Sequence, residues 1–101
     1  MTITTKKENS TLTILVSGRL DTTSSPELEK TVTENLSGVT ALIFDLSEMS
    51  YTSSAGLRVF LKSQKLMSSQ GEMKLINVSE AVMEIFEMTG FTDILTIEAS
   101  V

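Results

Sequence analysis

Two adjacent serines, Ser53 and Ser54, are the residues best placed for chemistry, because they stand where a helix is expected to begin. They follow a buried-looking strand at residues 41–46 and a short polar loop. At a helix N-terminus, a hydroxyl lies beside unpaired backbone N–H groups and the positive end of the helix dipole. A serine there can accept a phosphate group, and it can equally serve as the cap of the helix. Both interpretations are open at this stage.

The residues after the two serines favour access by another molecule. Ala55 and Gly56 add little side-chain bulk around the hydroxyls. Three basic side chains then follow Ser54 at spacings of four, eight and eleven residues, close to one line on the expected helix: Arg58, Lys62 and Lys65. The chain has only 8 basic residues, so this stripe is a candidate binding surface, although a solvated lysine-rich face has the same pattern.

Catalysis by the serines is not supported by the rest of the chain. The sequence has no histidine, so a Ser–His–Asp triad is impossible, and Ser-Ser-Ala-Gly is not the Gly-x-Ser-x-Gly elbow of hydrolases. It has no cysteine for a thiolate metal site and no Gly-x-x-x-x-Gly-Lys loop for nucleotide phosphates. We therefore expect a protein that is not an enzyme and that has no metal and no cofactor.

Length and charge limit the classes of function further. The 101 residues, 41% of them apolar, suit one small domain, residues 1–101. The net charge of −5 disfavours direct binding of nucleic acid or of an anionic membrane. The N-terminus lacks the apolar stretch of a signal peptide, and no apolar run approaches the ~20 residues that span a bilayer. We expect a cytoplasmic protein whose partners are other proteins.

The hydrophobic pattern predicts the order β-β-α-β-α-β-α with a short last strand. The expected strands cover residues 2–6, 11–17, 41–46, 73–77 and 94–97. The first helix begins near Pro26 and stops at Gly38, the second covers residues 54–69, and the third is capped by Asn77 or Ser79 and ends at Gly90. Strand–helix–strand units imply parallel neighbours, and the opening pair implies an antiparallel hairpin. We expect an α/β fold with one mixed, mostly parallel sheet and three helices packed against it.

The apolar positions predict which sides of these elements are buried. The continuous run at residues 41–44 is typical of a central strand that is covered on both faces. Each helix has an apolar side: Leu28, Val32 and Leu36 in the first, Leu57, Val59, Phe60, Leu61, Leu66 and Met67 in the second, and Val82, Ile85 and Phe86 in the third.

Three motifs follow one another along the chain. The first is Gly18-Arg19-Leu20-Asp21, before the first expected helix. The second is Asp45-Leu46-Ser47 followed by Ser53-Ser54-Ala55-Gly56-Leu57, and the third is Met88-Thr89-Gly90-Phe91. Together they resemble the motifs of the STAS domains of bacterial anti-sigma factor antagonists, in which Gly-x-Leu-Asp precedes the first helix. The resemblance covers nearly the whole chain without a large insertion, and it implies the STAS fold.

The resemblance implies a phosphorylation switch. In the family, an anti-sigma factor with serine-kinase activity phosphorylates a serine at the start of the second helix. The unphosphorylated antagonist binds this kinase and releases the sigma factor, the phosphorylated form does not bind, and a serine phosphatase resets the cycle. The matching acceptor is Ser54, two residues before Gly56. The family often has Asp-Ser-Ser-Gly here, so Ser53 stands in the position of the Asp. As a second serine, Ser53 is a rival acceptor. We expect Ser54 to be the acceptor and Ser53 to be the helix cap.

The same resemblance implies a partner-binding surface around this serine. Its residues are Asp21, Thr22, Ser53, Ser54, Ala55, Gly56, Arg58 and Lys62. Asp21 belongs to a loop that lies near the phosphorylation site in such domains, although an aspartate is also a common turn residue at a strand end. STAS domains also serve as accessory or docking subunits of transporters and sensory complexes without phosphorylation, and this is the alternative function.

Overall fold

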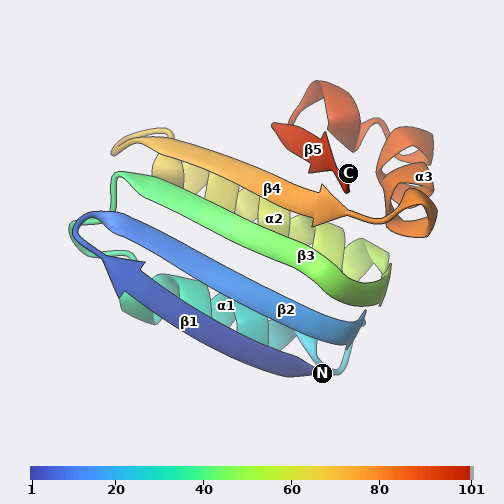
Figure 1. The fold of residues 1–101 in the computed structure, drawn as a ribbon, viewed down its shortest axis with the longest axis horizontal. Helices are drawn as coiled ribbons and strands as arrows, with labels where there is room; N and C mark the ends of the chain where they lie inside the picture. Colours follow the sequence, from blue (N-terminus) through green and yellow to red (C-terminus); the bar gives the residue numbers. More distant parts are fainter. Residues whose placement is uncertain (101) are drawn as a thin grey trace.

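A five-stranded sheet in the order β1-β2-β3-β4-β5 organises the chain (Figure 1). The computed structural model describes residues 1–100. β1 pairs antiparallel with β2, and β2, β3, β4 and β5 are parallel neighbours. The strands are β1 (Thr2–Glu8), β2 (Thr11–Leu20), β3 (Ala41–Thr52), β4 (Glu72–Val78) and β5 (Ile97–Ala99). The predicted mixed, mostly parallel sheet with an N-terminal hairpin is therefore confirmed.

Three α-helices connect the strands, as the sequence predicts. They are α1 (Ser25–Asn35), α2 (Ser54–Met67) and α3 (Glu80–Met88), and a short 3-10 helix, Phe91–Asp93, precedes β5. α1 and α2 lie behind the sheet, while α3 lies near the end toward which the parallel strands point (Figure 1). Among residues 1–100, no helix combines the length and the apolar character needed to cross a membrane.

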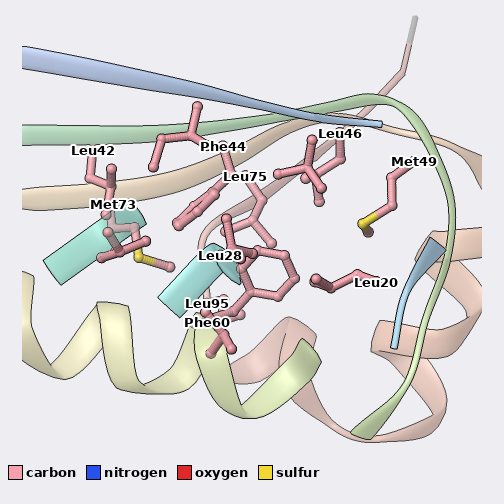
Figure 2. Packing of buried hydrophobic residues seen from close by; sticks show 14 of the residues in the cluster. Leu20, Leu28, Leu42, Phe44, Leu46, Met49, Phe60, Met73, Leu75 and Leu95 are labelled. Carbon is pink, nitrogen blue, oxygen red and sulfur yellow. The ribbon is translucent and has the colours of Figure 1, made fainter. Parts of the chain in front are cut away.

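The hydrophobic core fills the space between the sheet and the helices (Figure 2). Phe44 of β3 meets Phe60 of α2 edge-on, with ring centroids 5.0 Å apart. Phe60 also packs against Phe86 of α3 at 6.0 Å, so the three aromatic rings join the sheet to two helices. The predicted stripe of α1, Leu28, Val32 and Leu36, is buried in the same core.

Two predictions about burial are wrong. Residues 41–44 are not covered on both faces, because α1 and α2 pack on the same side of the sheet (Figure 1). Burial therefore alternates along β3, where Leu42 and Phe44 are buried and Ile43 is partly exposed on the face that the helices leave open. Leu66 is 37% exposed although it was assigned to the apolar side of α2. Its neighbour Met67, the last residue of α2, is fully buried, so Leu66 lies off the side of the helix that faces the core.

The central strand does not end at Leu46 but continues to Thr52, so the polar loop expected after residue 46 is absent. β2 also extends, to Leu20, and the two strands stay paired to Leu20↔Thr52 with two shifts of register. Met49 and Thr52 are buried, whereas Ser47, Glu48 and Ser50 are exposed. The polar residues of this stretch are thus the outward side of a strand, and not a loop.

The ends of the remaining elements differ from the predictions by a few residues. α1 ends at Asn35, and Gly38 forms the following turn with a φ of 77°. α2 ends at Met67 rather than residue 69. Ser79 caps α3 by accepting a hydrogen bond from the Val82 N–H, whereas Asn77 still belongs to β4. The last strand covers residues 97–99 instead of 94–97, because a 3-10 helix occupies residues 91–93.

Gly56 fixes the approach of α2 to the ends of β2 and β3. A Cβ atom at this position would lie 2.3 Å from the Thr52 Oγ1 atom and 2.8 Å from two carbons of the Leu20 side chain. Because Thr52 and Leu20 are buried, neither side chain can move aside without disturbing the core. Only glycine fits at this contact.

We expect Gly56→Ala to lower the free energy of unfolding by about 1–3 kcal/mol, as overpacking of a dense interior does. Chemical denaturation followed by circular dichroism measures this change. Ser54→Ala, two residues away and exposed, is the matched control and should change stability by less than about 0.5 kcal/mol. Equal stabilities of Gly56→Ala and Ser54→Ala would show that the packing around Gly56 is loose.

Candidate functional site

The ends of β2 and β3 bring the predicted site residues together. The Ser53 N–H donates a hydrogen bond to the Leu20 carbonyl oxygen at 2.8 Å, directly after the paired residues Leu20 and Thr52. The loop that begins at Asp21 therefore starts beside the first turn of α2. Carboxyl ends of parallel strands are the usual place for binding sites in open α/β sheets.

The two serines differ sharply in accessibility. Ser54 is the first residue of α2 and is exposed. The Ser53 Oγ atom is buried and finds no hydrogen-bond partner among residues 1–100. Ser53 occupies the N-cap position, as predicted, but its side chain makes no capping hydrogen bond; its backbone carbonyl accepts from the Leu57 N–H at 3.1 Å. The expectation that Ser53 is the cap is therefore confirmed for its position and wrong for its hydroxyl, which accepts no hydrogen bond from the first turn of α2.

Asp21 organises the loop between β2 and α1. Its Oδ1 atom accepts hydrogen bonds from the backbone N–H groups of Thr23 and Ser24, both at 3.0 Å, and from the Ser24 hydroxyl at 3.1 Å. The hydrogen bond from the Ser24 backbone is the main cause that lowers the pKa of Asp21, and Thr23 and the charge of Arg19 act in the same direction. The Asp21 carboxylate thus fixes the conformation of the loop that leads into α1. Thr22, in the same loop, is exposed.

The basic stripe lies on the surface, but its members are not equivalent. Arg58, Lys62 and Lys65 are all exposed, as is Ser54. Lys62 forms an ion pair with Glu29 of α1 at 3.1 Å, so part of its charge is neutralised. Arg58 borders a hollow of about 200 Å³ between the starts of α1 and α2, whose other walls include Thr22, Pro26 and Ala55. Three predicted residues, Thr22, Ala55 and Arg58, therefore meet in one depression next to Ser54.

Gly56 differs from the other predicted surface residues. It is buried in the first turn of α2, where it packs against Thr52 and Leu20. The role of Gly56 in the site is therefore to set the position of the exposed residues around it.

Asp45, the first residue of the Asp-Leu-Ser motif, connects two strands. Its Oδ1 atom accepts from the Ser47 N–H at 3.0 Å and from the Asn77 side chain of β4 at 3.3 Å. Partial burial raises the pKa of Asp45, but the hydrogen bonds from Ser47 and Asn77 outweigh this effect and leave the pKa below its ordinary value. Within residues 1–100, no group of three or more acidic side chains gathers in the way a metal ion would need.

One pair of residues at this end of the sheet was missed by sequence reasoning. The guanidinium carbon of Arg19 lies 4.3 Å from the centre of the Tyr51 ring, in a cation–π contact. The sequence predicts Tyr51 to lie in a loop, and Arg19 occupies the variable position of Gly-x-Leu-Asp. No local signal places Tyr51 on a strand, because Met49 and Thr52, the buried residues around it, are three positions apart and break the alternation of a regular strand.

Comparisons with known proteins agree with this geometry. The family model described as the STAS domain matches residues 2–101. The anti-sigma-B factor antagonist of Bacillus subtilis (strain 168) is 32% identical over 95 residues, which cover 93% of this chain and 87% of that protein.

Two solved structures share the fold at lower sequence identity. An anti-sigma factor antagonist from Mycobacterium paratuberculosis superposes with a TM-score of 0.87 at 19% identity, covering 96% of this chain and 84% of the other. The phosphorylated form of the Bacillus cell fate determinant SpoIIAA superposes with a TM-score of 0.74 at 18% identity, covering 95% of this chain and 90% of the other. With the family match over nearly the whole length and a relative above 30% identity, the chain belongs to the STAS-domain family of anti-sigma factor antagonists.

Proposed function

We propose that this protein is an anti-sigma factor antagonist that is switched off by phosphorylation of Ser54. In its unphosphorylated form it binds an anti-sigma factor with serine-kinase activity, and so regulates transcription that depends on the sigma factor. A serine phosphatase returns it to the active form. The observation that carries the proposal is the exposed Ser54 hydroxyl at the first position of α2, beside the Asp21 loop.

Accessibility favours Ser54 over Ser53 as the acceptor. A kinase must bring the γ-phosphate of ATP in line with the serine oxygen, and this needs an open approach to that oxygen. The Ser53 Oγ atom is buried, whereas Ser54 is exposed. Modification of Ser53 would require this buried oxygen to become accessible first.

The site can hold a phosphate group without unfolding. Phosphorylation adds about −1.5 to −2 charges, and the positive end of a helix dipole stabilises negative charge. Arg58 lies one turn further along α2 and adds a positive charge on the same side. The switch must therefore act at the interface with the partner. Burial of an unpaired dianion there costs several kcal/mol, and about 1.4 kcal/mol is already a tenfold loss of affinity.

The proposed contact surface follows from which predicted residues are accessible. Thr22, Ser54, Arg58 and Lys62 are exposed, and Asp21, Ser53 and Ala55 are partly buried beneath them. The hollow beside Arg58 would take a side chain of the partner. We propose that Asp21 contributes by shaping the loop that presents Thr22, because its carboxylate is engaged by backbone N–H groups of that loop.

The phosphorylation site is tested by incubating the chain with ATP and each purified ATP-binding anti-sigma factor of its source organism. We expect one of them to phosphorylate Ser54, as mapped by tandem mass spectrometry, and Ser54→Ala to abolish the modification. Ser53→Ala is the matched control and should leave it intact; since it removes a buried, unpaired hydroxyl, it should not destabilise the fold. Phosphate on Ser53 alone would make the assignment wrong. No phosphorylation, together with copurification of a transporter subunit, would favour the docking alternative.

Arg58→Glu should weaken binding to the anti-sigma factor by about tenfold or more, because it places a like charge or an unpaired charge in the contact surface. Isothermal titration calorimetry measures the affinity. The free energy of unfolding, followed by thermal melting, should change by less than about 0.5 kcal/mol, because Arg58 is exposed. Lys65→Glu carries the same charge change about 10 Å further along α2 and should bind nearly as wild type. Equal losses in the two variants would indicate only a general effect of net charge.

The pH dependence of stability tests the role of Asp21. Its pKa is lowered in the folded chain, so its ionised form stabilises the fold; this contribution is present above the ordinary pKa of 3.8 and is lost as the pH falls through the folded pKa. We expect Asp21→Asn to lose less thermal stability than wild type between pH 7 and about pH 3, because asparagine has no proton to gain. Asp93→Asn, an exposed control outside this loop, should follow wild type. If the melting temperatures of wild type and Asp21→Asn fell by the same amount as the pH was lowered, Asp21 would have no role in holding the loop.

A further inference from the structure

We infer that Arg19 and Tyr51 form a second contact with the anti-sigma factor, in which the Arg19 guanidinium binds a carboxylate of that partner. The inference rests on the proposed function, since it concerns the same complex. The two residues are Cα neighbours on β2 and β3. Their side chains stack with the guanidinium carbon 4.3 Å from the ring centre.

The pair lies on the face of the sheet that the helices leave open. Leu20 and Thr52, the next residues of the two strands, are buried toward α2. Successive side chains of a strand point to opposite faces, so Arg19 and Tyr51 point away from the helices. Arg19 is exposed and Tyr51 is partly buried.

The backbone of β2 departs from regular strand geometry just before Arg19, which changes the direction of this side chain. Gly18 has a φ of 88°, and the β2–β3 register shifts between Leu15 and Ser17 and again between Gly18 and Arg19. Irregularities of this kind re-aim side chains and are frequent next to functional sites. An exposed cation–π contact adds little stability by itself. The contact therefore contributes little to folding, and it leaves the Arg19 guanidinium exposed for a partner.

The pair adjoins the phosphorylation site. The Leu20 carbonyl, one residue after Arg19, accepts the hydrogen bond from the Ser53 N–H at 2.8 Å. A partner seated over Ser54 would therefore reach Arg19 around the carboxyl ends of β2 and β3. The positive charge of Arg19 also acts on Asp21, the first residue of the adjoining loop.

The chemistry of the pair indicates what it binds. Within residues 1–100, Arg19 takes part in none of the ion pairs, so its N–H groups are available for a carboxylate. A guanidinium that is stacked on a ring is already held in place, which lowers the entropy lost on binding. Arginine and tyrosine are also enriched among the residues that dominate binding energies at interfaces. The partner group that fits is an aspartate or glutamate side chain.

The test measures KM and kcat for phosphorylation of Ser54 by the anti-sigma factor that modifies the wild-type chain. Arg19→Ala should raise KM about tenfold with kcat nearly unchanged, because binding is weakened and the acceptor is untouched. Arg19→Lys should also raise KM, since lysine lacks the planar fork that binds a carboxylate through two hydrogen bonds. Tyr51→Phe keeps the ring and should behave as wild type, whereas Tyr51→Ala should resemble Arg19→Ala.

Lys6→Ala is the matched control, because Lys6 is an exposed basic residue on β1 that pairs with Glu8 at 2.9 Å. It should leave KM unchanged, and added salt should raise the KM of wild type more than that of Arg19→Ala. Thermal melting verifies that each variant is folded. Normal KM values for folded Arg19→Ala and Tyr51→Ala would overturn the inference and leave the proposed function intact. Absence of phosphorylation in wild type would instead overturn the proposed function.

Discussion

The pairing of β2 with β3 at their carboxyl ends is the interaction on which the rest of the site depends. It continues to Leu20↔Thr52, and the Ser53–Leu20 hydrogen bond extends the contact by one more residue. Gly56 then lets α2 approach these two buried side chains. The exposed Ser54, the Asp21 loop and the Arg19–Tyr51 pair all emerge from this one junction, so their relative positions are set by a packed interior and not by flexible loops.

The junction places two exposed arginines, Arg19 and Arg58, on the surface of an acidic protein. The chain has a net charge of −5, yet the first turn of α2 combines the positive end of a helix dipole with the exposed Arg58. Arg19, near the carboxyl end of β2, adds a second positive group on the open face of the sheet. A phosphate on Ser54 would add about −1.5 to −2 charges at this surface, above the buried contacts of the junction. A switch of this kind needs no change of fold, because the same rigid surface presents a different charge.

The order of elements could be predicted from the sequence because strand and helix periodicities agree with turn signals at the glycines and at Pro26. The extension of β3 to Thr52 could not, since its outer face is polar and local composition resembles a loop. Only the pairing with the extended β2, a contact between distant parts of the chain, reveals it. The open face of the sheet was missed for a similar reason: the apolar run at residues 41–44 does not tell a strand covered on both faces from one covered on a single face.

Within the site, the residue types were predictable and their geometry was not. Ser53 and Ser54 have the same chemistry, and only the structure separates a buried hydroxyl from an exposed one. The Lys62–Glu29 ion pair joins residues on two helices, so spacing along α2 alone gave no sign that Lys62 is partly neutralised. The Arg19–Tyr51 contact depends on a shifted strand register, which no local pattern encodes.

The central claim is that phosphorylation acts on the contact surface and leaves the fold intact. The most direct test compares the chain phosphorylated at Ser54 with the unmodified chain, by measuring both the affinity for the anti-sigma factor and the free energy of unfolding. The account predicts a loss of affinity of about 100-fold or more, the equivalent of about 2.8 kcal/mol, with an unfolding free energy changed by less than about 1 kcal/mol. Unchanged affinity, or a loss of affinity that accompanies a comparable loss of folding stability, would contradict it.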